Sequence, residues 1–283
     1  MASTPLRFLM TCWFYLVVCT FFIISFILQL LLYVLLLPFM LGSKRYRRQQ
    51  VMSFVFQTCM VLALLLMPFW RVKFIRRPPR CNYPQPLLIM CNHTSGCDPW
   101  VLTYALYPWP VLYVVKESLL RVPVAGWALH LAGNIPVRFT QEKGGWGTVP
   151  GTVKQLMQRS SEVLDEGMNL TVFPEGTRST SGRLQPFKDG FFRFALERPG
   201  CVILPLAMHG NHKMWPVNSR LVDSGTAYVN FGEPIIPHEG MTVAELKEKT
   251  HAAVFDLLRA SPDFDEALEQ PLTEVAATRG HGF

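Results

Sequence analysis

A histidine and an aspartate of the kind that act together in proton transfer stand five positions apart, at His93 and Asp98. They belong to the segment Asn-His-Thr-Ser-Gly-Cys-Asp, which follows a short apolar run at residues 86–90. A histidine in this position can act as a general base, while the carboxylate holds its ring and stabilises the imidazolium that forms. The first candidate chemistry is therefore removal of a proton from a hydroxyl group.

The spacing alone does not identify such a pair, because His251 and Asp256 have the same spacing. Their segment has the pattern of an amphipathic helix, on which five positions lie roughly 140° apart. These two side chains should therefore point in different directions. The local structure around His93, rather than the spacing, must carry the prediction.

A second segment offers groups that bind anions. Residues 173–179 read Phe-Pro-Glu-Gly-Thr-Arg-Ser and follow an apolar run at 169–172. Gly176, Thr177 and Arg178 would then lie at the carboxyl end of a strand, where open α/β sheets bind ligands. Backbone N–H groups, a hydroxyl and a guanidinium suit a phosphate. The competing interpretation is a surface turn with a solvated arginine.

Elements that would position these residues follow residue 80, where short apolar runs alternate with helical patterns. This alternation is typical of an α/β domain. Asp98 precedes Pro99, and an Asp before a proline at the first helical position predicts that Asp98 also caps a helix. The expected strands cover 86–91, 111–115, 134–137, 169–173, 201–207 and 226–231, and the expected helices cover 99–107, 124–131, 151–165, 190–197 and 243–260.

Four ordered blocks resemble the glycerolipid acyltransferase family. In chain order they are the Asn-His-x4-Asp block, a block made of Lys116 to Leu119 and Gly126 to Arg138, the Phe-Pro-Glu-Gly-Thr-Arg-Ser block, and Ile203 to Ala207. The resemblance spans roughly residues 80–235 and is closest to the 1-acylglycerol-3-phosphate acyltransferases. It implies an α/β domain with a mixed sheet flanked by helices, preceded by a helical membrane-anchoring region.

The resemblance also implies roles for particular residues. His93 would remove the proton of a lysophospholipid hydroxyl as its oxygen attacks the thioester of acyl-CoA, and Asp98 would fix the tautomer. No cofactor or metal is implied, since acyl-CoA is a co-substrate. The residues carried over to the phosphate site of lysophosphatidic acid are Lys116, Arg138, Glu175, Gly176, Thr177 and Arg178. For Lys116 and Arg138, a salt bridge or a solvated side chain is the alternative.

Other readings remain open at this point. A sibling acyltransferase would use glycerol-3-phosphate or another lysophospholipid. A membrane-bound hydrolase would need a nucleophile or metal ligands, but the chain has no GxSxG and no HExxH motif. Cys91 and Cys97 frame the histidine and are best explained as small buried residues. An inactive membrane-binding module is the third class.

The amino-terminal third predicts a membrane protein. Residues 8–43 hold no charged residue over 36 positions, and a bilayer-spanning helix needs about 20. A second apolar run at 51–70 lies between basic clusters at 44–48 and 71–80. If both clusters face the cytosol, the second run must re-enter the membrane or lie along its surface. The first run would then span once or form a shallow hairpin interrupted at Gln29 and Pro38, and two simple spans remain possible.

Charge separates the chain into two parts. Residues 1–97 hold ten Lys or Arg and no acid, whereas residues 98–283 hold 17 bases and 20 acids, a net charge of minus three. This arrangement favours anionic lipid headgroups over nucleic acid as the partner. We expect an anchoring region at 1–72, an acyltransferase domain at 73–262 and a tail at 263–283, in the endoplasmic reticulum membrane with the catalytic domain towards the cytosol. The sequence does not indicate an oligomeric state.

Overall fold

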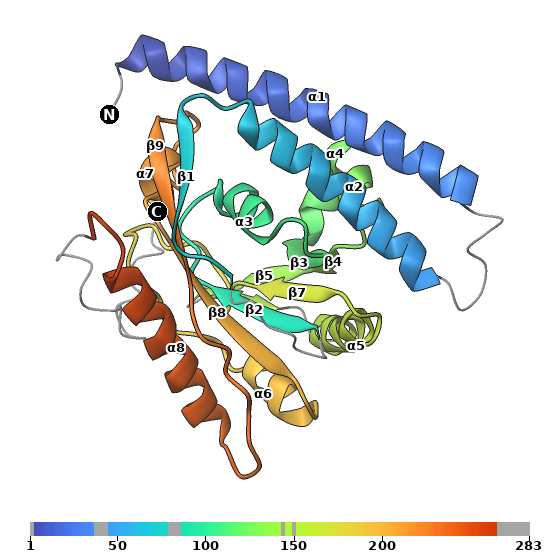
Figure 1. Cartoon of the computed structure of the whole chain (residues 1–283), viewed down its shortest axis with the longest axis vertical. Coiled ribbons are helices and arrows are strands. Elements are labelled where there is room, and N and C mark those ends of the chain that lie inside the picture. Colours follow the sequence, from blue (N-terminus) through green and yellow to red (C-terminus); the bar gives the residue numbers. More distant parts are fainter. Residues whose placement is uncertain (1–2, 37–44, 79–85, 143–144, 149–150, 265–283) are drawn as a thin grey trace.

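A seven-stranded sheet in the order β1-β9-β8-β2-β7-β3-β4 lies between two layers of helices (Figure 1). The computed structural model describes residues 3–36, 45–78, 86–142, 145–148 and 151–264. The strands of this sheet are β1 (Trp70–Arg76), β2 (Leu87–Cys91), β3 (Val111–Lys116), β4 (Ile135–Val137), β7 (Asn169–Val172), β8 (Val202–His209) and β9 (Gly225–Phe231). A separate hairpin joins β5 (Phe139–Glu142) to β6 (Gly145–Thr148).

The helices between and around these strands match the predicted alternation. They are α1 (Thr4–Leu36), α2 (Arg45–Leu65), α3 (Asp98–Leu106), α4 (Ala125–Leu131), α5 (Thr152–Asp165), α6 (Gly190–Glu197), α7 (Asn211–Met214) and α8 (Val243–Arg259), with a 3₁₀ turn at Glu117–Arg121. The prediction of an α/β domain with a mixed sheet flanked by helices is confirmed. The α7 turn, the 3₁₀ turn and the β5–β6 hairpin were not predicted, because each is too short to show a periodic pattern.

Strand direction determines which loops meet. Strands β8, β2, β7, β3 and β4 run parallel to one another, and only the β8–β9 contact is antiparallel in this sheet. The carboxyl ends of the five parallel strands therefore lie along one edge. The segments that follow β2 and β7, which hold the two motifs, are neighbours at that edge because β2 pairs with β7.

Side chains alternate between the two faces of the central strands. Leu87 and Ile89 of β2 pack towards α1, α2 and α3, whereas Leu88 and Met90 pack towards α5, α6 and α8. All four are at most 5% exposed. Burying each such side chain contributes about 1.5–3 kcal/mol, so the central strands need apolar residues on both faces. This explains why these strands read as continuous apolar runs.

The long helix α1 lies across the domain along much of its length (Figure 1). Near its beginning, Thr11 Oγ1 accepts a hydrogen bond from Val222 N at 3.0 Å. Near its end, buried Gln29 Nε2 donates to the carbonyl oxygens of Met52 and Ala128 at 3.1 and 3.2 Å. Gln29 was expected to interrupt the apolar run, and that prediction is wrong. Its amide instead joins an unbroken helix to α2 and α4, and Pro38 lies outside the described residues.

The second apolar run is part of the folded domain. Within α2, buried Ser53 and Gln57 both donate to the carbonyl oxygen of Val111 in β3, at 3.1 and 2.7 Å. Of the described helices, only α1 is long and apolar enough to cross a membrane by length and composition. The run expected at 51–70 also ends in Trp70, the first residue of β1.

Strand β1 was not predicted from the sequence, because its apolar residues alternate with basic ones and form no continuous apolar run. Arg71 and Lys73 are exposed while Val72 and Phe74 are partly buried, which is the pattern of an edge strand with one wet face. It pairs in parallel with β9. The boundary expected between residues 72 and 73 falls inside this strand, and most of the expected tail lies outside the described residues.

Candidate active site

The imidazole of His93 lies just after β2 and faces the carboxylate of Asp98. Nδ1 is 2.7 Å from Asp98 Oδ2, and the His93 side chain remains 18% exposed. A carboxylate only accepts hydrogen bonds, so Nδ1 carries the proton of this pair and Nε2 of the neutral ring is left as an acceptor. The ring stacks on Phe173 at 3.9 Å between centroids and 14° between planes. These contacts fix the orientation of an imidazole that remains partly exposed.

Asp98 is completely buried and receives several N–H groups. Besides His93 Nδ1, its Oδ2 accepts from the backbone of Thr94 at 2.6 Å and of Ser95 at 2.8 Å. The prediction that Asp98 caps a helix is wrong, because α3 begins at Asp98 itself and has no side-chain cap. Its carboxylate turns back into the preceding loop instead. The Asp98 carboxylate therefore holds the loop of residues 93–95 in place through its hydrogen bonds.

The second motif holds the backbone of His93 from the neighbouring strand. The His93 N–H donates to Glu175 Oε1 at 2.6 Å, and the His93 carbonyl accepts from Ser179 N at 2.7 Å. Phe173 of the same segment supplies the stacking ring. The two motifs, which are 80 positions apart in the chain, therefore form one structure around a single residue.

Glu175 is only 2% exposed and both of its oxygens are bonded. Oε2 accepts from Gln185 N at 3.1 Å and from Gln185 Nε2 at 2.9 Å. Burial raises the pKa of Glu175 to about 8, although the three donated hydrogen bonds lower it. In the described structure Glu175 thus supports His93. Its predicted contribution to the phosphate pocket is indirect, through the turn that follows it.

The turn after Glu175 has the conformation expected of a glycine. Gly176 has φ of +74° and its N–H donates to Phe173 O at 3.0 Å, while Thr177 O accepts from Gln185 Nε2 at 2.9 Å. Arg178 is exposed beside this turn, and no hydrogen-bond or ion-pair partner is recorded for its guanidinium within the described ranges. Its charge is available to an anionic ligand next to His93.

Lys116 and Arg138 lie on the same edge of the sheet but farther along it. Lys116 ends β3 and Arg138 follows β4, so they are two and three strands away from β2. At about 4.8 Å per strand, these positions lie roughly 10 and 14 Å along the edge. Arg138 makes a double hydrogen bond to Glu117 with both distances at 2.7 Å. The salt bridge considered as the alternative for Arg138 is therefore present.

Three residues that the motifs did not reveal complete the surroundings. Asn211 of α7 donates from Nδ2 to Asp98 Oδ1 at 2.8 Å, and Trp215 O accepts from Ser95 Oγ at 2.7 Å. Gln185 organises Glu175 as described above. A signal for Asn211 existed, since it follows the predicted proline-containing strand at the same sheet edge as the motifs. Nothing in the local sequence around Gln185 or Trp215 indicated a role.

The histidine and aspartate pair at 251 and 256 behaves as expected of an ordinary helix. The His251 ring packs edge-on against Phe187 at 4.7 Å and its Nε2 lies 3.3 Å from the carbonyl oxygen of Gln185. Burial lowers the pKa of His251. The prediction that local structure, and not spacing, distinguishes His93 is confirmed.

The two cysteines near the dyad are structural. Cys91 and Cys97 are both fully buried, and burial raises the pKa of each thiol well above its usual range. A nucleophilic cysteine needs a lowered pKa and access to substrate. The environment of these two thiols therefore does not suit covalent catalysis.

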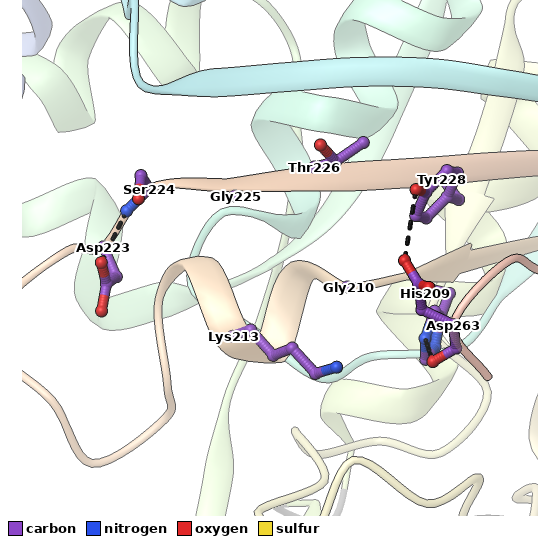
Figure 2. Close-up of a pocket in the computed structure, with 9 residues that line it drawn as sticks. All are labelled: His209, Gly210, Lys213, Asp223, Ser224, Gly225, Thr226, Tyr228 and Asp263. Carbon is purple, nitrogen blue, oxygen red and sulfur yellow. Dashed lines mark hydrogen bonds between the residues drawn. The ribbon is translucent and has the colours of Figure 1, made fainter. Parts of the chain in front are cut away.

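A cavity of about 420 Å³ lies on the β9 side of α7 (Figure 2). The Lys213 side chain extends into it, and Tyr228 and His209 reach Asp263 across it, with Nε2 of His209 3.1 Å from the Asp263 carbonyl. Its lining holds two carboxylates, Asp223 and Asp263, against one ammonium. It therefore lacks the positive excess that a phosphate site requires.

Comparisons with known proteins agree with this geometry. The family model described as Acyltransferase matches residues 74–209. A 1-acyl-sn-glycerol-3-phosphate acyltransferase of Pseudomonas aeruginosa is 30% identical over 200 residues, covering 69% of this chain and 73% of that protein. The chloroplastic enzyme BAT2 of Brassica napus is 27% identical over 70% of this chain. The match spans only 54% of BAT2, so the chain corresponds to about half the length of that relative.

A solved structure shares the fold over nearly the whole chain. The crystal structure of the 1-acyl-sn-glycerophosphate (LPA) acyltransferase PlsC from Thermotoga maritima superposes with a TM-score of 0.67, covering 91% of this chain and 98% of that one at 18% identity. At this identity the likeness concerns the fold alone. Together with the Pseudomonas relative and the two joined motifs, it leads to one conclusion. The chain belongs to the glycerolipid acyltransferase family, among relatives named 1-acyl-sn-glycerol-3-phosphate acyltransferases.

Proposed function

We propose that the chain transfers a fatty acyl group from acyl-CoA to the free sn-2 hydroxyl of 1-acylglycerol-3-phosphate, which yields phosphatidic acid. One observation carries the chemical part of this proposal. His93 is held by Asp98 at Nδ1 and by Glu175 and Ser179 at its backbone, which leaves Nε2 as the free acceptor. The substrate part is supported by the names of the relatives, which act on this acceptor.

The reaction then proceeds by direct transfer. His93 Nε2 takes the hydroxyl proton as the oxygen attacks the thioester carbonyl, and Asp98 stabilises the imidazolium that forms. When the tetrahedral intermediate collapses, the carbon–sulfur bond breaks and the CoA thiolate takes the proton back from His93. The oxyanion of the intermediate needs hydrogen-bond donors at about 2.7–3.1 Å.

The acceptor phosphate would bind at the turn of the second motif. Arg178 supplies an exposed guanidinium there, and Gly176 allows a close approach of the backbone. The Lys188 side chain lies across Gly176, with its Cγ 3.6 Å from where a Cβ would stand. Arg178 directly precedes Ser179, whose N–H donates to the His93 carbonyl, and this contact supports a phosphate site near His93.

The outer face of α1 is the proposed membrane contact. Its inner face packs on the domain, whereas its outer face exposes large apolar side chains that a soluble monomer rarely presents together. The exposed residues of α1 include Phe8, Leu9, Leu16, Ile27, Leu31, Val34 and Leu35. Arg7 near the beginning of α1 and Gln29 near its end both bond to the domain. We therefore propose that α1 lies in one leaflet of the membrane rather than crossing the bilayer.

This placement agrees with the nature of the substrates. A lysophospholipid and its product both reside in the bilayer, and each CH₂ group withdrawn into water costs about 0.8 kcal/mol. Soluble acyl-CoA would approach from the cytosol. The membrane of the endoplasmic reticulum remains our expectation for the location, with the chloroplastic names of two plant relatives as the competing indication.

An acceptor panel tests the proposal. Purified protein with acyl-CoA should acylate lysophosphatidic acid faster than glycerol-3-phosphate, lysophosphatidylcholine or lysophosphatidylethanolamine, as measured by radiolabelled product. The variant His93→Ala should lose about 10²- to 10⁴-fold in kcat while keeping its thermal unfolding midpoint. Exposed His238 provides the control, since His238→Ala should leave kcat unchanged. Preference for an acceptor without a phosphomonoester would assign the chain to a sibling activity, and unchanged turnover in His93→Ala would refute the mechanism.

A further inference from the structure

We infer that Asn211 is a positioning residue that holds the catalytic carboxylate of Asp98 in the orientation His93 requires. This inference rests on the proposed mechanism. Within the described ranges, three donors reach Asp98 Oδ2, whereas the Asn211 amide is the one donor that reaches Oδ1, at 2.8 Å. Without that amide, one oxygen of a completely buried carboxylate has no hydrogen bond.

The orientation of the Asn211 amide is set by the carboxylate. Asn211 is 0% exposed, and its Oδ1 has no hydrogen-bond partner in the described part of the chain. Turning the amide over would place Oδ1 against Asp98 Oδ1, and two acceptors at this distance repel. The side chain thus leaves its own oxygen unsatisfied in order to donate to Asp98. Such an arrangement is costly for a residue that only fills space.

Backbone contacts make Asn211 a fixed point. It follows β8 and Gly210, whose φ is +90°, and its carbonyl accepts from Trp215 N at 3.1 Å and from Cys97 Sγ at 3.7 Å. Gly96 packs so closely on Trp215 that an added Cβ would lie 2.9 Å from that ring. The histidine loop therefore packs against the α7 turn. Within that turn, Asn211 is the residue that contacts Asp98.

The chemical consequence concerns the direction of the carboxylate. With Oδ1 held by Asn211, Oδ2 is directed at His93 Nδ1, so the imidazole keeps the tautomer in which Nε2 accepts the substrate proton. A carboxylate that rotates or shares a proton no longer fixes this tautomer. The other titratable groups around Asp98 are Cys97 on its own loop, Cys91 on β2 and Glu175 after β7.

Two substitutions test the inference. Asn211→Leu removes the donor and keeps the volume, while Asn211→Asp keeps the shape and replaces the donor with an acceptor. Both should lower kcat about 100-fold with the KM of each substrate unchanged, because the change acts on the geometry of proton transfer. The control is Asn230→Leu, which removes another buried amide, bonded to Leu257 O at 3.0 Å on the far side of β9. It should lose stability but keep kcat.

The dependence of thermal stability on pH provides a second measurement, which needs no substrate. In Asn211→Asp the two adjacent carboxyl groups share a proton, so the folded state holds a proton that the unfolded state releases. Relative to the natural chain, this variant should therefore unfold at lower temperature at pH 8 than at pH 5.5. A loss of stability relative to the natural chain that is the same at both pH values, or a kcat for Asn211→Leu equal to that of Asn230→Leu, overturns the inference.

The outcomes separate this inference from the proposed function. If His93→Ala keeps its turnover, the mechanism fails, and the pH-dependent stability of Asn211→Asp still decides whether Asn211 donates to Asp98. If His93→Ala loses its turnover while both Asn211 variants keep theirs, the mechanism stands and the inference fails. If Asn211→Asp folds at neither pH, the kcat of Asn211→Leu decides.

Discussion

The guanidinium groups of Arg178 and Arg138 illustrate how a single contact determines what a residue can do. Both were carried over from the family pattern, Arg178 from the more specific motif and Arg138 with a salt bridge or a solvated side chain as its alternative. In the structure Arg138 is bonded twice to Glu117, and this hydrogen bonding lowers the pKa of Glu117, whereas Arg178 is exposed beside the turn that follows Glu175. The sequence contained both charges, but only the fold showed which of them is already paired.

This difference predicts distinct kinetic effects. Arg178→Ala should raise the KM for lysophosphatidic acid about 10- to 100-fold, the worth of one charge-assisted hydrogen bond to phosphate. Arg138→Ala, which breaks an exposed ion pair, should change the same KM by less than about fivefold. Steady-state assays with varied acceptor at saturating acyl-CoA measure both. A larger effect from Arg138→Ala would mean that it leaves Glu117 when substrate binds.

Glu175 predicts a dependence of stability on pH. Its folded-state pKa of about 8 lies above the usual value near 4.5. The folded protein therefore retains a proton that the unfolded chain loses, and stability contributed by this group is greatest below about pH 4.5 and is lost as pH rises towards 8. The expected slope from one such group is about 1.4 kcal/mol per pH unit between these limits.

Urea unfolding of the natural chain and of Glu175→Gln between pH 5 and 8 measures this contribution. The glutamine variant should show a shallower decline with pH, since it cannot exchange the proton. Parallel curves for the two proteins would show that Glu175 is already ionised in the fold at pH 5, held so by its three N–H donors.

At the scale of elements, the short α7 turn connects the sheet to the catalytic loop. It begins after Gly210, where a Cβ would stand 2.2 Å from the carbonyl oxygen of Thr226. The positive φ of +90° is also unfavourable for any residue with a Cβ. Glycine is therefore required at this position for two separate reasons, and both act on the placement of Asn211.

The variant Gly210→Ala should be destabilised by about 2 kcal/mol or more and should lose kcat. Gly240→Ala is a matched control, because Gly240 has φ of +83° but nothing within 4 Å of the added Cβ. Its cost should be the backbone strain of about 1–2 kcal/mol, with normal kcat. Chemical denaturation and initial rates distinguish them, and equal effects in the two variants would show that the approach to Thr226 is relieved by relaxation.

At the scale of the whole molecule, α1 connects the proposed membrane-contacting face to the candidate active site. Phe14 is 1% exposed and packs against Trp215 at 5.0 Å and Trp100 at 6.2 Å between centroids. Trp215 in turn supports the histidine loop through Ser95. One face of this helix is thus part of the catalytic domain, while the opposite face is apolar and exposed.

Charges on that outer face should release the protein from membranes. The double variant Leu16→Glu and Leu31→Glu changes two side chains that are 60% and 55% exposed, whereas Ile236→Glu changes one that is 57% exposed away from α1. Co-sedimentation with phosphatidylcholine and phosphatidylglycerol vesicles should fall strongly for the double variant and remain unchanged for Ile236→Glu. Equal binding by all three proteins would refute the assignment of this face.

The sequence by itself predicted most of the strands and helices of the α/β domain and singled out the two motifs. Alternating apolar runs and helical patterns are local properties, so the α/β class followed from them. His93 and Asp98 followed from their residue types beside a predicted strand and from the motif that resembles the family. The tertiary structure decided the rest. Asn211 lies 113 positions from Asp98, Gln185 shows no local pattern, and α1 could be assigned to the domain only through its contacts. Such long-range hydrogen bonds leave no periodic trace, because they depend on where the strands end and not on what surrounds each residue in the chain.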